Sequence, residues 1–167
     1  MRKIEVVEYN PAWAAEFEAI CAEIAAALGG LCVVVEHVGS TAVPGLWAKP
    51  IIDIDVVIKG GMFERVADEL SKIGYEHVGD QGINGREAFK YEGKEHLMRH
   101  HLYVCEEGAA EFLRHIALRD FLRGNEEYRR RYGDIKREMA LMHTYDIDKY
   151  ISGKEPVILE IYGICGL

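Results

Sequence analysis

Two aspartates separated by one residue are the clearest chemical signal in the sequence. Asp53 and Asp55 stand in the run IIDIDVVI, whose β-branched residues predict a strand over residues 50–58. Because successive side chains of a strand point to opposite faces, the two carboxylates share one face, and the isoleucines and valine at 52, 54, 56 and 58 share the other. The pattern therefore predicts two carboxylates on one patch of a sheet.

Two like charges at this spacing repel each other and lose solvation when they are covered, so they need compensation. Mg²⁺ and Mn²⁺ prefer oxygen ligands, and Mg²⁺ is usually held by one or two carboxylates together with substrate phosphates. We therefore predict that Asp53 and Asp55 are catalytic metal ligands for Mg²⁺ or Mn²⁺. A solvated sheet face or strand end also explains an isolated D-x-D pair, and the spacing alone leaves that alternative open.

A loop that follows a predicted strand over 32–38 supports the metal interpretation. Gly39 lets the backbone approach a phosphate closely, and Ser40 adds a hydroxyl and an N–H donor. Lys49 brings a positive charge close to the same strand end. These three residues are predicted to bind the phosphates of a substrate.

The longer segments around these residues resemble the GrpB family of the nucleotidyltransferase superfamily. The resemblance is carried by HVGSTAVPGL at 37–46 and AKPIIDI at 48–54, and it continues through RHHLYV, HIALRDFLR and the region of Lys154. It implies a small sheet with flanking helices, in which the Gly-Ser turn holds nucleotide phosphates and the D-x-D pair binds a divalent metal. It also implies that the partners are a nucleoside triphosphate and an unknown small acceptor. Domains related to this family also occur fused to dephospho-coenzyme A kinase.

One departure from the superfamily bears on catalysis. Its members commonly carry a third carboxylate on a neighbouring strand, whereas the predicted strand His100–Cys105 carries no acid. His101 and Tyr103 share a face of that strand. We predict that His101 contacts substrate, with two alternatives left open: replacement of the third metal ligand, or a hydrogen bond inside the fold.

The remaining pattern predicts a mixed sheet flanked by helices. Helical spacing of apolar residues covers 11–28 and 62–73, and short strands are predicted at 75–78 and 87–91. From residue 109 onward the pattern is helical. We therefore expect a single α+β domain over 1–167, with a nucleotidyltransferase-like sheet and a helical C-terminal third.

Composition restricts the class of partner. A net charge of −8 makes nucleic acid an improbable partner, since that affinity comes from lysines and arginines that neutralise phosphates. No apolar stretch is long enough to span a membrane. The four cysteines lack C-x-x-C spacing and are interpreted as reduced core thiols, which favours a cytoplasmic location.

Two further patterns have ordinary explanations. Histidines at 37, 96, 100 and 101 suggest a zinc hydrolase only weakly, because their spacing matches no zinc motif. The mixed charges of 111–140, Lys136 among them, are typical of a solvated helix face. Arg119 and Asp120 are an exception: Asp120 falls on an apolar stripe and is predicted to need a buried partner, which favours an internal ion pair over a catalytic role.

The sequence thus supports three hypotheses of different classes. The first is a metal-dependent nucleotidyltransferase-like enzyme that binds a nucleoside triphosphate and transfers a nucleotidyl group to a small acceptor. The second is a non-catalytic nucleotide- or metal-binding regulatory domain on the same fold, motivated by the missing carboxylate. The third is a structural module whose acidic pair is solvated.

Overall fold

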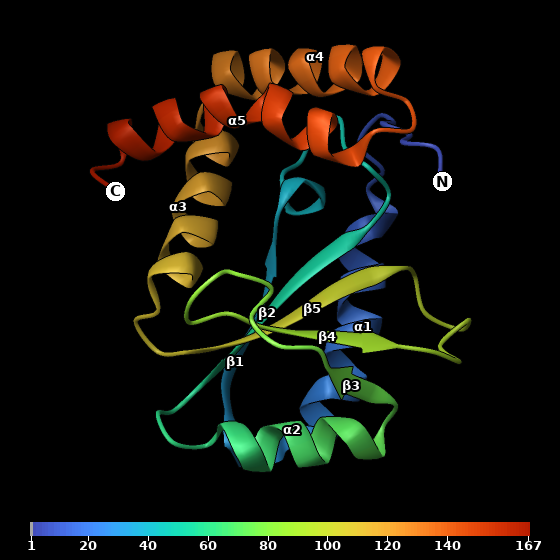
Figure 1. Ribbon diagram of the computed structural model, residues 1–167, viewed down its shortest axis with the longest axis vertical. Helices are drawn as coiled ribbons and strands as arrows, with labels where there is room; N and C mark the ends of the chain where they lie inside the picture. Colours follow the sequence, from blue (N-terminus) through green and yellow to red (C-terminus); the bar gives the residue numbers. More distant parts are fainter. Residues whose placement is uncertain (1) are drawn as a thin grey trace.

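A five-stranded mixed sheet forms the centre of the computed structural model, which describes residues 2–167 (Figure 1). The strand order is β1-β2-β5-β4-β3, in which β2 and β5 are parallel and every other neighbouring pair is antiparallel. The strands are β1 Cys32–Val38, β2 Ile52–Ile58, β3 Tyr75–His77, β4 Glu87–Tyr91 and β5 His100–Glu106. The mixed sheet predicted from the sequence is confirmed.

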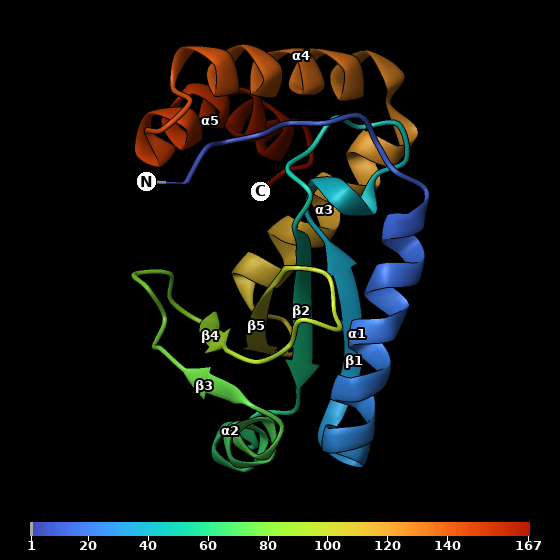
Figure 2. The same ribbon diagram turned by 90° about the vertical axis from the view of Figure 1, so that its right-hand side faces the viewer.

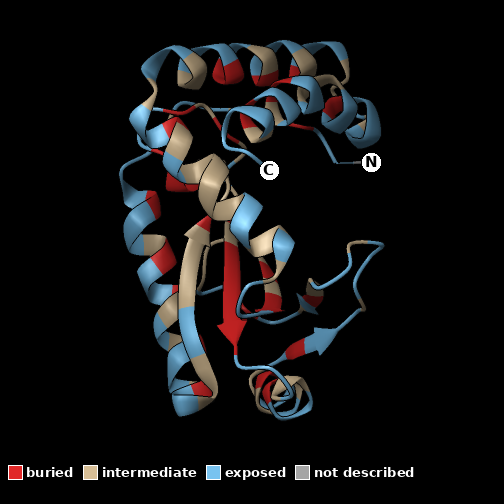
Figure 3. Cartoon of the chain, turned by 90° about the vertical axis from the view of Figure 1, so that its left-hand side faces the viewer, coloured by how far each residue is buried: buried red, intermediate tan, exposed pale blue. Residues whose placement is uncertain are grey.

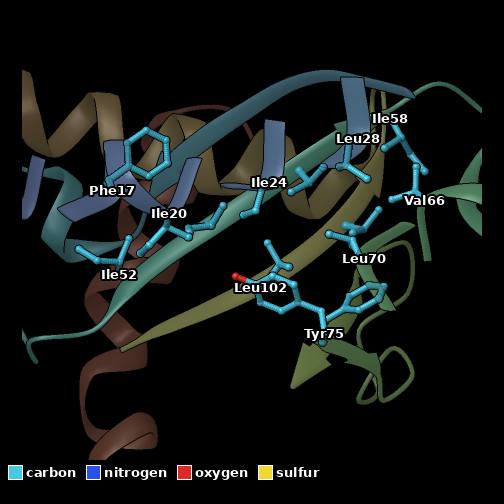
Figure 4. Packing of buried hydrophobic residues seen from close by; sticks show 14 of the residues in the cluster. Phe17, Ile20, Ile24, Leu28, Ile52, Ile58, Val66, Leu70, Tyr75 and Leu102 are labelled. Carbon is cyan, nitrogen blue, oxygen red and sulfur yellow. The ribbon is translucent and has the colours of Figure 1, made fainter. Parts of the chain in front are cut away.

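One face of the sheet is covered by α1 (Ala12–Leu28) and α2 (Phe63–Lys72) (Figure 2). The alternate isoleucines and valines of β2 point to this face, where they pack against α1 and against Leu102 of β5. Figure 4 shows the apolar side chains of α1, β2 and α2 meeting in this core. Burial of this set on one face leaves the alternate positions of β2 for the opposite face.

The C-terminal third consists of three helices, α3 (Ala110–Gly124), α4 (Glu126–Met142) and α5 (Ile147–Ile164). Helices α4 and α5 lie across one end of the molecule, and α3 runs down from them towards the sheet (Figure 1). A second apolar cluster joins them to the loop after β1 and includes Leu46, Leu122, Tyr132 and Ile161. The predicted helical C-terminal third is confirmed.

Strand β2 is buried along its whole length except at Asp53, which is half-buried (Figure 3). It is flanked by strands on both edges, by α1 on one face and by α3 on the other, which explains why its residues other than the two aspartates are apolar. Asp55 is a charged residue in this buried strand, with 1% exposure. Such a residue needs polar partners.

Three sequence-based expectations are wrong in detail. The side chain of Asp120 is 54% exposed, and the buried member of its ion pair is Arg119, at 11% exposure. Lys136 is fully buried rather than solvated, because α4 turns it towards the sheet. Cys165 is exposed near the C-terminal end, although Cys105 is a buried thiol as expected.

Within residues 2–167, no helix is both long enough and apolar enough to cross a membrane.

Candidate functional site

The register of the sheet brings the polar residues into two rows on the face opposite α1. Asp53 pairs with Val38 of β1 and His101 of β5, and Asp55 pairs with Glu36 and Tyr103. Side chains that are paired across strands lie close together on one face. The predicted projection of both aspartates from the same face is therefore observed.

The turn after β1 lies directly against Asp53. Gly39 has φ 72° and ψ −172°, a conformation that side-chain-bearing residues rarely adopt. A Cβ atom at this position would lie 2.3 Å from Oδ2 of Asp53, so only glycine fits here. Ser40 then begins a short 3-10 helix of residues 40–42. The Gly-Ser turn and the first aspartate thus form one unit.

Three lysines from three elements surround this unit. Lys136 of α4 donates from Nζ to Oγ of Ser40 at 2.8 Å. Lys49 precedes β2 and Lys154 lies on α5, with Nζ atoms 5.4 and 5.2 Å from the centre of the Tyr150 ring. None of the three ammonium groups forms an ion pair with a carboxylate of residues 2–167.

The pKa values of these lysines are all shifted downwards. Burial lowers the pKa of Lys136 well below its usual value, and the neighbouring charge of Lys154 lowers it further. Burial likewise lowers the pKa of Lys49 and that of Lys154. Lys136 is buried, and Lys49 and Lys154 are half-buried. Cations that are withdrawn from water without an acidic partner are costly, and a bound polyanion would compensate them.

Each aspartate is held by a histidine. Nδ1 of His101 lies 2.9 Å from Oδ1 of Asp53, which leaves Oδ2 beside Gly39. Burial favours the neutral acid, but the bond from His101 and the charges of Lys154 and Lys49 outweigh it and lower the pKa of Asp53. Asp53 is therefore a carboxylate at neutral pH.

Asp55 is joined to α3 by a chain of hydrogen bonds. Nδ1 of His115 lies 2.6 Å from Oδ2 of Asp55, and Nε2 of the same ring lies 3.2 Å from Oε1 of Glu111. Burial disfavours the charged ring, yet the two acids raise the pKa of His115 to about 9. The other oxygen of Asp55, Oδ1, is buried without a hydrogen-bond partner. It is free to accept a further donor or a cation.

Apart from Asp55, which lies behind them, these residues line one cavity of about 760 Å³ between the sheet and the helices α3, α4 and α5. Lysines and arginines outnumber acids in its lining by six to three, although the protein as a whole is acidic. Arg86 lies on the side of Asp55, with its guanidinium 4.1 Å from the centre of the Tyr103 ring. The cavity is suited to an anionic ligand of the size of a nucleotide.

The two aspartates fit a divalent cation that a ligand helps to hold. Each carboxylate has one oxygen engaged by a histidine and one oxygen without such a bond, and Oδ1 of Asp55 lacks any protein partner. Within residues 2–167, no group of three or more acidic, histidine or cysteine side chains is arranged to bind a metal. Asp53 and Asp55 would therefore hold Mg²⁺ or Mn²⁺ only together with substrate oxygens.

Comparison with protein families agrees with these features. The family model described as "GrpB protein" matches residues 3–163. The chain belongs to the GrpB family.

Relatives in this family extend the comparison. UPF0157 protein YqkA of Bacillus subtilis is 33% identical over 155 residues, which cover 92% of this chain and 45% of YqkA. A dephospho-CoA kinase of Mycobacterium leprae is 28% identical over 184 residues, which cover 94% of this chain and 45% of that protein. In both relatives the GrpB-like part is thus less than half of a longer protein.

Solved structures show the same fold. The crystal structure of the conserved protein GrpB from Enterococcus faecalis covers 98% of this chain and 100% of its own chain, at 34% identity and a TM-score of 0.82. The Cid1 structure in complex with its short product ApU covers 78% of this chain and 42% of its own, at 10% identity and a TM-score of 0.56. Cid1 is described as a poly(U) polymerase, which is a nucleotidyltransferase, so the GrpB fold is nucleotidyltransferase-like.

The structure assembles the predicted residues and adds others. The predicted set Gly39, Ser40, Lys49, Asp53 and His101 lines the cavity, and Asp55 lies behind them, bonded to His115. Sequence reasoning missed Arg86 of the loop before β4 and the residues that the helices supply, which are Glu111, His115, Lys136 and Lys154. The segment HIALRDFLR contained a signal, because its histidine lies four residues after an acid on a helix.

The histidines of the zinc alternative are dispersed. His37 stacks on Phe17 and contacts Oγ1 of Thr41, and His100 contacts the hydroxyl of Tyr75. His96 contacts Glu23 at the surface. Only His101 of this set reaches the cavity, so the four histidines do not form one zinc site.

Proposed function

We propose that this GrpB-family protein is a metal-dependent nucleotidyltransferase that binds a nucleoside triphosphate and transfers a nucleotidyl group to a small acceptor. One observation carries the proposal. Three lysines without acidic partners surround the Gly39-Ser40 turn, beside two aspartates that each keep one oxygen free of their histidine partner. This combination suits a polyphosphate held with a divalent cation.

The phosphate chain would lie along the turn. Ser40 offers its hydroxyl and its backbone N–H, while the ammonium of Lys136 stands 2.8 Å from the hydroxyl oxygen. Lys49 and Lys154 supply two further positive charges that face the cavity. Positioning and charge neutralisation of this kind account for most of the catalysis of phosphoryl and nucleotidyl transfer.

In the proposed transfer, an acceptor oxygen forms a bond to the α-phosphorus while the bond from that phosphorus to the α–β bridging oxygen breaks. Pyrophosphate leaves with the negative charge, and the acceptor proton passes to solvent. Lysines near the leaving phosphates stabilise that charge. A divalent ion bound by Asp53 and Asp55 supplies additional neutralisation of the phosphate oxygens.

A second candidate is a nucleotide-binding domain without catalysis. It is favoured by the identity of the residue paired with Asp53, because β5 presents His101 where the superfamily commonly places a third carboxylate. The acid Glu106 at the end of β5 pairs with Ile58, beyond both aspartates, and bonds to Gly61. This candidate predicts saturable nucleotide binding with no turnover.

Calorimetric titration tests the proposal first. Mg²⁺ or Mn²⁺ with ATP or GTP is titrated into the wild type, an Asp53→Asn/Asp55→Asn variant and a control, Asp68→Asn/Asp134→Asn, whose acids are exposed. We expect saturable binding that the site variant loses and the control keeps. Equal binding in all three proteins, or none, contradicts a metal-nucleotide site at these aspartates.

Turnover separates the two candidates. The wild type is incubated with each nucleoside triphosphate, Mg²⁺ or Mn²⁺ and a panel of hydroxyl and phosphate acceptors, and pyrophosphate release is measured. If the protein is an enzyme, we expect pyrophosphate release that depends on one acceptor of the panel. Binding without release across the panel favours the non-catalytic domain.

A further inference from the structure

A second hollow adjoins the site and has a distinct lining. This N-terminal groove, of about 1050 Å³, lies between the N-terminal segment, the start of β2 and the connection from α4 to α5. Its lining comprises Arg2, Lys3, Ile4, Glu5, Lys49, Pro50, Ile51, Arg99 and residues 142–149. Two of these residues, Lys49 and Ile51, also line the cavity that holds Asp53. The groove and the cavity are therefore neighbours that share a wall.

The cations of the groove divide into paired and unpaired ones. Lys3 bonds to Glu5, and Lys149 bonds to Asp146, each at 3.1 Å. Arg2 and Arg99 form no ion pair with any acid of residues 2–167. Arg2 and Arg99 thus differ from the two paired lysines of the same groove in having guanidinium groups that no carboxylate of the described residues already occupies.

The unpaired cations are close enough to influence one another. Partial burial and the charge of Arg2 lower the pKa of Arg99. Burial lowers the pKa of Lys49, and the charges of Lys154 and Arg99 add to that effect. Arg99 is thus within electrostatic range of both Arg2 and Lys49, and Lys49 lines the cavity as well as the groove. Repulsion among these cations is relieved when an anion lies beside them.

We infer that the N-terminal groove binds the anionic head group of the acceptor, a small phosphate or carboxylate compound that also carries a hydroxyl. Arg2 and Arg99 would hold the anion, since guanidinium groups pair with the oxygens of phosphate and carboxylate. Because Lys49 and Ile51 line both the groove and the cavity, a hydroxyl that extends past them would approach Asp53. The role as acceptor rests on the proposed transfer, but the anion site itself does not.

A titration followed by NMR of the arginine side chains tests the inference in the full chain. The probes are glycerol 3-phosphate, glycerate and uncharged glycerol, with and without a saturating ATP analogue whose α–β bridge resists cleavage, plus Mg²⁺. The variant is Arg2→Ala/Arg99→Ala, and the matched control is Lys3→Ala/Lys149→Ala, which removes two paired cations from the same groove. The two anionic probes distinguish phosphate from carboxylate.

We expect saturable shifts of Arg99 with one anionic probe and none with glycerol. Affinity should fall about tenfold or more in the arginine variant, as for loss of charge-assisted bonds, and should be retained in the control. Absence of saturation, equal affinity in the arginine variant, or displacement of the probe by the ATP analogue would overturn the groove site. If the ATP analogue does not bind the wild type, that result contradicts the proposed function instead. The titration of the groove with the anionic probes still tests the groove site in that case.

Discussion

Individual residues of the site have little freedom, because each one is constrained by a neighbour. One carboxylate oxygen of Asp53 packs against Gly39, and the other is hydrogen-bonded to His101. Ser40 is bonded to the buried Lys136. A phosphate that enters the cavity therefore meets groups that are already oriented, which lowers the entropic cost of binding.

Gly39→Ala tests this constraint. The new Cβ would lie 2.3 Å from Oδ2 of Asp53, and the positive φ adds strain of about 1–3 kcal/mol. We expect lower stability in urea unfolding together with loss of Mg-ATP binding in calorimetry, because Asp53 must move.

Gly61→Ala is the matched control for this change. Gly61 also has a positive φ, 79°, but an added Cβ there meets no atom within 4 Å. It should lose stability through strain alone and keep Mg-ATP binding. If Gly39→Ala binds Mg-ATP as well as Gly61→Ala does, the turn is not part of the site.

At the scale of elements, α3 is attached to the sheet by polar side chains. His115 bonds to Asp55 of β2, and Arg119 bonds to Glu36 of β1 at 2.7 Å and to the carbonyl of His37 at 3.1 Å. These bonds satisfy charged groups that the apolar surroundings would otherwise disfavour. Helix α3 consequently places Glu111 and Arg119 at the cavity.

The attachment through His115 predicts a pH dependence. The pKa of His115 is about 9 in the folded protein and about 6.5 in the unfolded protein. The contribution of His115 to the free energy of unfolding is therefore complete below about pH 6.5 and is lost as the pH rises through about 9. This shift corresponds to about 3 kcal/mol.

Urea unfolding of wild type and His115→Gln across this range measures the effect. The difference in the free energy of unfolding between the two proteins should shrink steadily from pH 6.5 to 10. The effects of the other titrating groups are common to both proteins and cancel in this difference. A difference that is constant over this range would show that His115 is not a charged partner of Asp55 and Glu111.

At the scale of the whole molecule, the site is a junction between two clusters. The sheet and α1 form one apolar core, and α3, α4 and α5 form another with the loop after β1. Lys136 comes from the second cluster and reaches Ser40 beside the first. Burial lowers the pKa of Lys136, so its charged form costs stability in the absence of a ligand, which is typical of functional sites.

Lys136→Met should therefore separate stability from binding. Methionine has a similar unbranched shape and removes the buried charge, so the melting temperature should rise, while the affinity for Mg-ATP should fall about tenfold or more. Lys72→Met, which removes an exposed lysine bonded to Glu69, is the control for the charge change alone. A melting temperature that falls, with unchanged Mg-ATP affinity, would show that Lys136 serves the fold rather than a ligand.

The sequence by itself determined the local parts of this protein. Strand alternation placed Asp53 and Asp55 on one face, and the glycine after β1 indicated a close backbone approach, because both properties depend only on neighbours along the chain. The order of strand and helix patterns predicted a mixed sheet and a helical C-terminal third, and the family resemblance implied a small sheet with flanking helices; the structure confirms these features.

Only the tertiary structure decided which distant residues complete the site. Lys136 was assigned to a solvated face because its helix carries balanced charges, and Asp120 was assigned to the core because it follows an apolar stripe. The rotation of each helix against the sheet reversed both assignments. The same packing brought His115 to Asp55 and Lys154 to the cavity. These residues are far apart in the sequence, and the periodicity of a single helix or strand says nothing about contacts between elements. Such contacts depend on how whole faces pack against each other.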